Sequence, residues 1–333
     1  MTSGAHVLGF GLACPLGLHA RSALAAMRAG ISRFAEVDGF VGPGGPVRAS
    51  RLAQISPDSS RVARATMLAR HAVREAAGRT AAPVACFLAL PDPMFGPRID
   101  PDRLLHDLAD DLNGLRLVLH PPGAGATGRA GVFTALTAAL HWLDGGTERR
   151  ALVGGIDSLV DLETLDALAA DDRLLGATNL DGAIPGEAAA FVLLGGPSAS
   201  TRPQPGARIV ALATGHDARP RDRADATIDP ADGLTAVFRQ LRAAFPHRVD
   251  RVHAGITGQT RFGREFSFAY LRNAPLLPEP LHCEPLGQAL GDVGAAAGAV
   301  SLVQAVASLG PGEHALVYAS SDDGGIGAAV LAG

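Results

Sequence analysis

The chain of 333 residues contains no lysine, so any acid–base chemistry falls to His, Asp, Glu, Cys or Tyr. Without lysine it can form no Schiff base, hold no pyridoxal phosphate and offer no Walker-A contact to a phosphate. The three cysteines, Cys14, Cys86 and Cys283, are too scattered to form a disulfide framework or a metal cluster. His282 and Cys283 are adjacent, but neighbours in an extended strand point to opposite sides, so adjacency alone makes no catalytic dyad.

Gly123, Gly125 and Gly128 form a G-x-G-x-x-G pattern ahead of a helical segment, which is the setting of a dinucleotide-binding turn. However, Pro121 and Pro122 interrupt that turn, and no acidic residue ends a second strand at the usual spacing. A close-packed strand-to-helix turn is therefore favoured. The motifs G-x-S-x-G, H-E-x-x-H and C-x-x-C do not occur. We expect no cofactor and no metal.

Charge and composition narrow the class of protein. The net charge of −4 gives no basic footprint for nucleic acid or anionic lipid. No stretch of ~18 uncharged apolar residues predicts a transmembrane helix, and the first residues lack the basic region of a signal peptide. We expect a cytoplasmic protein that binds neither nucleic acid nor membranes. Since only 5% of the residues are aromatic, small aliphatic residues and glycine must pack the interior, which suits closely layered sheets and helices.

The clearest boundary is the Gly-, Pro- and Ser-rich segment 195–206, which predicts a surface linker between residues 1–195 and residues 207–333. On either side the chain repeats itself in outline. Short apolar runs typical of buried parallel strands begin, in the first half, at His6, Ala82 and Arg150 and, in the second, at Arg208, Asp250 and His314. The repetition predicts two similar halves within one compact unit.

Helical patterns lie between these strands, at Arg61–Arg79, Gly131–Leu143, Gly233–Phe245 and Ala295–Leu309. The last is apolar around its whole circumference, which predicts a buried helix. Strands that alternate with helices indicate βαβ-type units. The sequence therefore predicts an α/β fold in which duplicated units form a layered sandwich.

Four blocks, in order, resemble the β-ketoacyl synthase family of the thiolase fold. Val7–Gly17 is similar to the family's opening strand and loop. The stretch from Gly131 to Leu194 is similar to its buried nucleophile helix, its GG-x-(E/D)-S strand and, at Gly182–Leu194, its G-E-(G/A)-A segment. Leu286–Val306 is similar to its G-H-x-x-G-A-A-G helix, and Ser320–Leu331 to its closing Gly-rich loop and strand. The resemblance covers most of the chain. It implies a layered αβαβα sandwich of two pseudo-symmetric halves.

The resemblance also implies which residues to inspect. The family uses a cysteine at the N-terminus of a buried helix as its acyl acceptor, two histidines for decarboxylation and oxyanion stabilisation, and often a supporting lysine. Here these positions fall on Gly128 (or Arg129 if the gap moves by one) for the cysteine, Gly255 and Gln288 for the histidines, and Cys283 for the lysine. Loss of all four implies that condensation through a cysteinyl thioester is gone.

We therefore expect a catalytically degenerate member resembling the chain-length factors, which lack the nucleophile and pair with an active ketosynthase in fatty acid or polyketide biosynthesis. Its partner would be such a ketosynthase, in a heterodimer, or a second copy of the chain. In the family the strand equivalent to Leu115–Pro122 pairs across the dimer, so polar substitutions at Leu117 or Leu119 are expected to release monomers. Acyl carrier protein is a further possible partner, with a basic candidate at Arg219, Arg221 and Arg223.

Two alternatives remain open. The first is an acyltransferase or hydrolase with a rebuilt active site, in which Cys283 and His253 do the chemistry. Candidate pocket residues, within or beside the blocks that line the family's pocket, are Thr127, Arg129, His253, Thr257, Cys283 and Asp292. The second alternative is a non-enzymatic adaptor that uses the fold as a platform. Asp322 and Asp323, ahead of two glycines, are interpreted as a turn.

Overall fold

The computed structural model describes residues 4–78, 84–92, 99–109, 117–120, 127–146, 149–196, 206–217 and 231–333. Within them, ten strands form one mixed sheet. The first five are β1 (Ala5–Ala13), β4 (Val84–Ala89), β5 (Leu117–Leu119), β6 (Arg150–Ser158) and β7 (Glu187–Gly195). The second five are β8 (Arg208–His216), β9 (Arg251–Ala254), β10 (Cys283–Pro285), β11 (His314–Ser320) and β12 (Gly325–Ala332).

The strand order is symmetric about the centre of the sheet. Outward from β1 the order is β7, β6, β4 and β5, and outward from β8 it is β12, β11, β9 and β10. The two groups of five meet where Ala5 pairs with Ile209 and His6 with Arg208. The predicted α/β fold made of two similar units is therefore confirmed. Of the expected linker 195–206, residues 197–205 lie outside the described residues, and Gly195 is the last residue of β7.

Strand direction differs in part from the expectation of parallel strands. The pairs β4–β5, β4–β6, β9–β10 and β9–β11 are parallel. By contrast, β1 and β8 are antiparallel to both of their neighbours. The prediction was wrong for the runs from His6 and Arg208, because a buried apolar strand has the same composition whichever way its neighbour runs.

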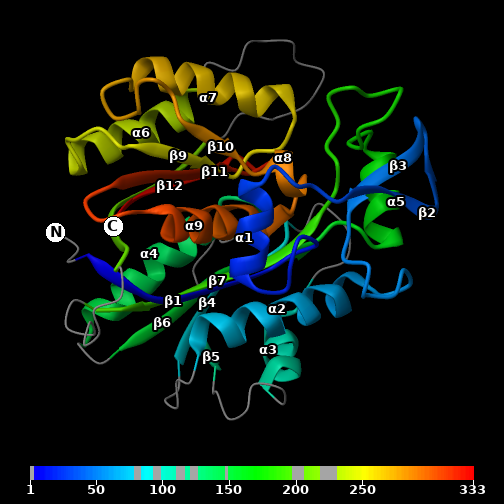
Figure 1. Cartoon of the computed structure of the whole chain (residues 1–333), viewed down its shortest axis with the longest axis horizontal. Helices are drawn as coiled ribbons and strands as arrows, with labels where there is room; N and C mark the ends of the chain where they lie inside the picture. Colours follow the sequence, from blue (N-terminus) through cyan, green and yellow to red (C-terminus); the bar gives the residue numbers. More distant parts are fainter. Residues whose placement is uncertain are drawn as a thin grey trace.

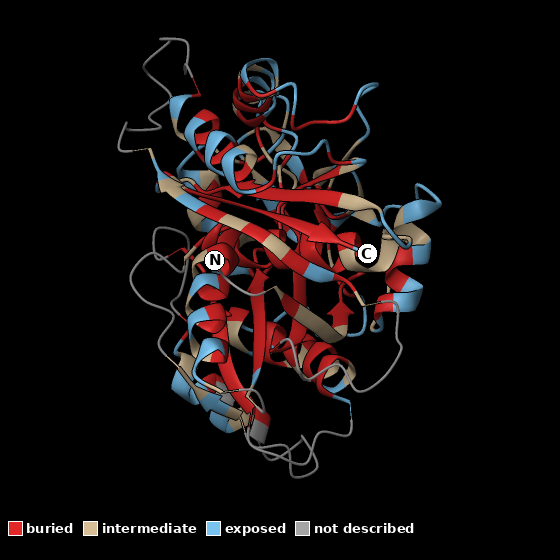
Figure 2. Cartoon of the chain, turned by 90° about the vertical axis from the view of Figure 1, so that its left-hand side faces the viewer, coloured by how far each residue is buried: buried red, intermediate tan, exposed pale blue. Residues whose placement is uncertain are grey.

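The helices complete five layers, αβαβα (Figure 1). Between the two halves of the sheet lie α4 (Gly131–Asp144) and α9 (Ala297–Ser308), whose side chains share one core cluster with both halves. One outer face is covered by α2 (Arg61–Ala77) and α3 (Pro101–Ala109), and the other by α6 (Asp232–Ala244) and α7 (Thr260–Arg272). Figure 2 shows buried residues concentrated in the strands and exposed residues on the outer helices.

The central helices pack closely because their contact lacks side-chain bulk. Every residue of Ala297–Ala305 in α9 is buried, which confirms the helix expected to be buried all round. A Cβ on Gly298 would lie 2.7 Å from the backbone oxygen of Arg129, so only glycine allows α9 to approach the start of α4 this closely. The two central helices are thus fixed where their N-terminal ends meet.

The remaining elements lie around this sandwich. They are α1 (Ala20–Arg28), the hairpin of β2 (Phe34–Gly42) and β3 (Gly45–Ser50), α5 (Leu162–Ala170) and α8 (Gly287–Leu290). The hairpin and α5 share a small apolar core of their own. In the described ranges, every helix falls short of the length and apolar character needed to cross a bilayer.

Candidate functional site

Gly128 lies three residues before Gly131, the first residue of the buried helix α4, at the position where the resemblance places a nucleophile. Its φ of +64° is a left-handed conformation that favours glycine, and its N–H donates to the carbonyl of Leu90 at 3.0 Å. A Cβ at this position would lie 2.8 Å from Ser321 Oγ. That hydroxyl accepts a 2.8 Å hydrogen bond from the backbone N–H of Ala130, at the start of α4. The hydroxyl of Ser321 therefore crowds the position that a Cβ at residue 128 would take.

Arg129, the next residue, is 4% exposed and is held by two carboxylates. Its Nε donates to Asp292 Oδ1 at 3.0 Å, and its Nη2 pairs with the second oxygen of the same carboxylate. Its Nη1 donates to Asp322 Oδ2 at 2.6 Å. This is a charge-assisted arrangement with a bidentate contact, the geometry that fixes a guanidinium most firmly.

Two further arginines complete the cluster. Arg173 Nη2 lies 2.8 Å from Asp322 Oδ2, and Arg261 Nη2 donates to Asp322 Oδ1. The guanidiniums of Arg129 and Arg261 also lie over the ring of Phe262, at 5.1 and 4.4 Å from its centre. We refer to the five charged residues, Arg129, Arg173, Arg261, Asp292 and Asp322, as the Arg129 network.

The charges of the network are fixed by their neighbours. Burial by itself raises the pKa of Asp322, but Arg129, Arg261 and Arg173 outweigh it and hold the pKa of that carboxyl well below its usual range. Burial lowers the pKa of Arg129, but Asp292 and Asp322 outweigh it and raise the pKa above its ordinary value. Both groups therefore stay ionised at neutral pH, and neither is suited to transfer a proton.

Two threonines from the candidate pocket border the network. Thr127 Oγ1 donates to Asp323 Oδ2 at 3.3 Å. Thr257 Oγ1 accepts from the backbone N–H of Gln259 at 3.3 Å, and the side-chain oxygen of Gln259 accepts from Arg261 at 3.4 Å. The structure thus brings Thr127, Arg129, Thr257 and Asp292 together around the start of α4.

His253 lies elsewhere, on β9 against the opposite end of α9. Its Nε2 is 3.1 Å from the hydroxyl of Ser308, the last residue of that helix, and its Nδ1 is 3.4 Å from Glu284 Oε2. Burial, then Arg251 and His282, lowers the pKa of His253 to about 3. The imidazole is therefore neutral at physiological pH and a weak base.

Cys283 faces away from His253. On β10 it pairs in register with Val252, whereas Glu284 pairs with His253, so the thiol and the imidazole lie on opposite faces of the sheet. Burial, then Glu284, raises the pKa of Cys283 to about 12. The structure does not bring Cys283 and His253 together as a catalytic pair.

The two positions that the resemblance matches to the family's histidines, Gly255 and Gln288, have different surroundings. Gly255 is buried, and a Cβ there would lie 3.0 Å from the Cβ of Ala319 and 3.4 Å from the backbone of Ala297, at the start of α9. Gln288, on the short helix α8, is exposed. Neither position presents a side chain with acid–base function to the Arg129 network.

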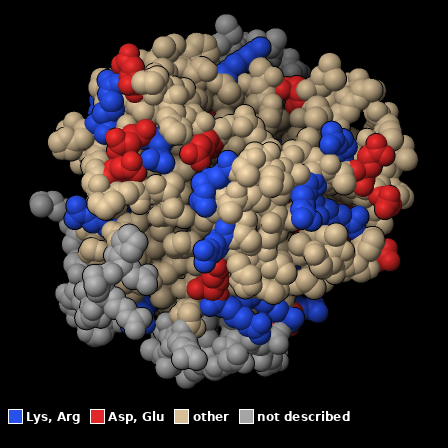
Figure 3. Space-filling view, viewed as in Figure 1, with Lys and Arg blue, Asp and Glu red and all other residues tan. Residues whose placement is uncertain are grey.

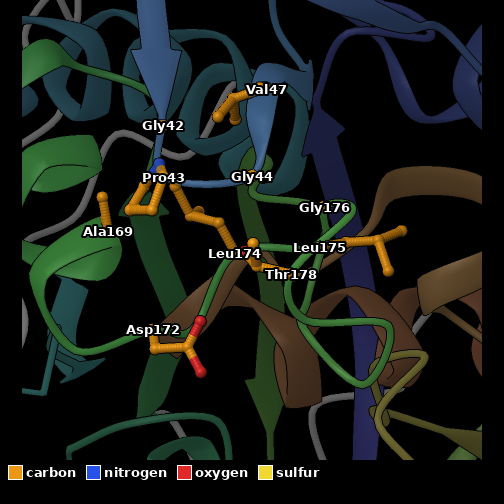
Figure 4. Close-up of a pocket in the computed structure, with 11 residues that line it drawn as sticks. Gly42, Pro43, Gly44, Val47, Ala169, Asp172, Leu174, Leu175, Gly176 and Thr178 are labelled. Atoms are coloured by element: carbon orange, nitrogen blue, oxygen red, sulfur yellow. The ribbon is translucent and has the colours of Figure 1, made fainter.

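A small surface hollow lies between the tip of the β2–β3 hairpin and the loop 172–178 (Figure 4). Glycine backbone and apolar side chains such as Val47 and Leu174 form most of its wall, and Asp172 is its only titratable group. A single carboxylate supplies neither a nucleophile–base pair nor a set of metal ligands. Over the described residues, no three His, Cys, Asp or Glu side chains are arranged to hold a metal ion.

Comparison with solved structures identifies the fold of this chain. No family model matches this chain, and no curated protein matches it. Among solved structures, it is similar to the ishigamide ketosynthase/chain length factor, with 19% identity over 98% of this chain and 99% of the other, at a TM-score of 0.70. It is also similar to AntDE:AntF, a type II polyketide acyl-carrier protein in complex with its ketosynthase, with 14% identity, full coverage of both chains and a TM-score of 0.75.

A third similar structure is the ketosynthase from module 6 of the bacillaene synthase of Bacillus subtilis 168. It is 12% identical over 98% of this chain and 72% of its own, at a TM-score of 0.72. The expected fold is thereby confirmed: the chain has the thiolase-type architecture of ketosynthases and of a ketosynthase/chain length factor.

Proposed function

We propose that this chain is a non-condensing, ketosynthase-like subunit that partners an active ketosynthase in fatty acid or polyketide biosynthesis, in the manner of a chain-length factor. The observation that carries the proposal is the arrangement of residues at the start of α4. There, the buried Arg129 network surrounds the position, Gly128 or Arg129, that the sequence resemblance matches to the family's nucleophilic cysteine.

The remaining thiols do not substitute for that cysteine. Cys14 and Cys86 are fully buried, and burial raises the pKa of each to about 12, the same value as for Cys283. Acyl transfer to cysteine needs the thiolate, which these environments disfavour. The opposite orientation of Cys283 and His253 leaves the alternative of a rebuilt acyltransferase or hydrolase without a supporting contact.

The similar structures suggest the partner. One is a ketosynthase/chain length factor, and another holds a ketosynthase in complex with its acyl-carrier protein. We therefore place this chain in a heterodimer with an active ketosynthase, and the acyl carrier protein as the component that brings substrate to the assembly. The basic candidate for its contact, Arg219, Arg221 and Arg223, lies outside the described residues.

The interface we propose is the outer edge of β5. Within the described part of the chain this strand ends the sheet, and we infer that the outer side of its backbone pairs with a partner strand. Its three residues differ in role: Val118 is 44% exposed, whereas Leu117 and Leu119 pack against the outer core cluster beneath α2. The structure therefore makes Val118 the sharper probe of association, since changes at Leu117 or Leu119 also remove core contacts.

Reconstitution with the active ketosynthase and acyl carrier protein of the same host tests the proposal. The chain alone is expected to form no malonyl-dependent product. The ketosynthase is expected to require this chain in order to make a product of defined length. A triple variant, Cys14→Ala, Cys86→Ala and Cys283→Ala, is expected to support the same product, provided circular dichroism shows it folded. Condensation by this chain alone would overturn the proposal. If the product is unchanged when the chain is omitted, the result would favour the alternative of a non-enzymatic adaptor.

A further inference from the structure

The second half of the molecule holds a serine, a histidine and a carboxylate in a row. His253 on β9 is fully buried, and its Nε2 lies 3.1 Å from the hydroxyl of Ser308, the last residue of α9. Its other ring nitrogen, Nδ1, lies 3.4 Å from Oε2 of Glu284, the residue that pairs with it on β10. In Figure 1 the two strands lie in one layer and α9 in the next. The imidazole therefore lies between a hydroxyl and a carboxylate.

The carboxylate determines which nitrogen of His253 carries the proton. A carboxylate facing Nδ1 favours the tautomer with Nδ1–H, since the other tautomer would set a lone pair against negative charge. Nε2 is then an acceptor for the O–H of Ser308. The backbone carbonyl of Ala305, 3.1 Å from the same hydroxyl, competes for that proton. The row thus runs from Glu284 through an Nδ1–H imidazole to a serine hydroxyl.

This order of groups is that of a serine nucleophile and its base. A neutral imidazole that contacts a serine Oγ through Nε2 takes its proton, and a carboxylate at Nδ1 orients the ring and stabilises the imidazolium that forms. Such contacts are often longer in a free protein than with substrate bound. Ser308 is partly exposed, as are Leu309 and Gly310 after it, so this end of α9 is open to solvent.

Arg251 supplies a donor at the same end of α9. It lies two residues before His253 and therefore on the same face of β9. Its Nη2 pairs with Glu313, which also accepts from the backbone N–H of Gly310, two residues after Ser308. Among the described residues, the Nε–H of Arg251 is buried and has no hydrogen-bond partner. A substrate's carbonyl oxygen would satisfy this donor, which would also stabilise negative charge developing on that oxygen.

The charges around the row are balanced. Arg251 pairs with Glu313, and Glu284, which faces His253, also lies 3.4 Å from Nε2 of His282. Figure 3 shows a similar mixture of acidic and basic side chains over one largely uncharged face of the molecule. An uncharged substrate fits this balance better than an anion or a cation does.

We propose that Ser308, with His253 as its base, is a nucleophile that takes the acyl group of a small, uncharged carboxylic ester. The Oγ of Ser308 bonds to the carbonyl carbon as its proton passes to Nε2 of His253. The bond from that carbon to the alcohol oxygen then breaks, and the alcohol leaves with the proton. Water cleaves the acyl-serine by the same proton transfers, which releases a carboxylic acid and restores the hydroxyl. Glu284 acts as a positioning residue. The site lies at the opposite end of α9 from the Arg129 network and does not depend on the proposed function.

The surroundings of His253 set how the site responds to pH. The ring is faced by Glu284 from β10, by uncharged Val317 from β11 and by Ser308 from α9. Burial, then Arg251 and His282, lowers the pKa of His253 to about 3, so the imidazole is neutral from pH 5 to pH 8. A weak base makes acylation slow, but its rate is expected to change by less than about twofold over that range. A base with the ordinary histidine pKa of about 6.5 would be about thirtyfold slower at pH 5 than at pH 8.

The test is labelling of the full chain by a fluorophosphonate, which phosphonylates activated serines with loss of fluoride, followed by mass spectrometry of the adduct. Ser308 is expected to be labelled. Ser267 is the matched control within the chain: it is exposed, and its hydroxyl likewise bonds a carbonyl of its own helix, that of Gly263, at 2.8 Å. It is expected to stay unlabelled. Ser308→Ala is expected to remove the label and to slow hydrolysis of p-nitrophenyl acetate at least about tenfold, whereas Ser267→Ala keeps both.

Glu284→Gln tests the positioning role. Because it removes the charge at Nδ1, it is expected to slow labelling of Ser308 at least about tenfold, with the melting temperature within a few degrees of wild type. Nitrogen-15 NMR of the His253 ring is expected to show the proton on Nδ1 in the wild type and on Nε2 in this variant. A purely structural role for Glu284 would leave the tautomer unchanged.

The outcomes decide this inference separately from the proposed function. No label on Ser308, equal labelling of Ser267, or a wild-type proton on Nε2 would overturn it. If Ser308→Ala does not fold, the adduct mapped on the wild type still decides. Ser308→Ala is expected to leave the ketosynthase complex and its product unchanged, and failure of that complex to form would count against the proposed function alone.

Discussion

At the residue scale, the start of α4 is organised by one buried arginine and the carboxylates that bind it. The guanidinium of Arg129 donates hydrogen bonds to Asp292 and Asp322, and neither carboxylate is more than 7% exposed. A buried ion pair adds little net stability, because desolvation offsets the attraction. Removing one partner is costly, since the other charge is then buried without compensation. The Arg129 network is therefore an all-or-none arrangement.

The first prediction concerns this asymmetry. Arg129→Ala is expected to lower the free energy of unfolding by about 3–5 kcal/mol, because it leaves the buried carboxylate of Asp292 without its guanidinium partner. Urea unfolding followed by circular dichroism measures the loss. Arg21→Ala, which removes an exposed arginine, is the control and is expected to change stability by less than about 0.5 kcal/mol. Equal stability of the two variants would contradict the role of the network.

The second prediction concerns pH. The folded-state pKa of Asp322 lies below its unfolded value of about 3.9, so its contribution to stability is fully present above pH ~4 and is lost as the pH falls toward the folded value. Between pH 4 and pH 2 the wild type is expected to lose stability more steeply than Asp322→Asn, which has no carboxylate to protonate. Urea midpoints at several pH values give the two slopes. Equal slopes for the two proteins would show that the arginines do not lower the pKa of Asp322.

The third prediction concerns the thiols. Because burial raises the pKa of Cys283 to about 12, its thiolate is scarce at pH 8, and a thiol reagent is expected to label it slowly in the native protein. Cys14 and Cys86, fully buried, are expected to stay unlabelled until denaturant is added, when all three react. Rapid labelling of Cys283 by an acyl-like electrophile would instead support the alternative of an enzyme with a rebuilt active site.

At the element scale, local pattern located the strands and helices well but did not assign their partners. The apolar runs from His6, Ala82 and Arg150 became β1, β4 and β6, and the all-apolar helix became α9. Strand direction was wrong for β1 and β8, because direction depends on how the chain returns to the sheet and not on the strand's own residues.

The same limit applies to the candidate site. The sequence indicated Arg129 and Asp292, but Asp322 was interpreted as part of a turn, and Arg173 and Arg261 carried no signal. The bonds that define the network join residues 163 and 193 positions apart. Only the fold brings such residues together. Asp323 does form the expected turn, with its carboxylate accepting a hydrogen bond from the N–H of Gly325. The local pattern therefore predicted the turn correctly but did not indicate the ion pairs of Asp322.

The fourth prediction belongs to β5. Val118→Arg is expected to abolish the complex with the ketosynthase in size-exclusion chromatography with light scattering, while the melting temperature of the isolated chain stays within a few degrees of wild type. Leu117→Arg is expected to lower the melting temperature, since Leu117 packs against the outer core. Val41→Arg, at another exposed valine, is the control and should leave the complex intact. A stable complex of Val118→Arg would move the interface away from this edge.

At the scale of the whole molecule, the two halves depend on each other. Helices α4 and α9 lie between them and share one core cluster with strands of both. Charge joins them as well: Arg129 belongs to the first half and Asp292 and Asp322 to the second, and Asp157 of β6 accepts from the N–H of Ala295 at 3.0 Å. Each half also has an outer core cluster of its own, but the central cluster and these bonds are shared, so we infer that residues 1–195 and 207–333 unfold as one cooperative unit.

The chain carries its own reporters for this last prediction. Its single tryptophan, Trp142, lies in the first half, and its two tyrosines, Tyr270 and Tyr318, lie in the second. Urea unfolding followed by tryptophan fluorescence, and by tyrosine fluorescence in a Trp142→Phe variant, is expected to give the same midpoint as circular dichroism of each protein at one fixed concentration, as two-state behaviour requires. A tyrosine transition that separates from circular dichroism would mean that the second half unfolds alone. The Arg129 network would then hold together two domains that fold independently, and Arg129→Ala should widen the separation.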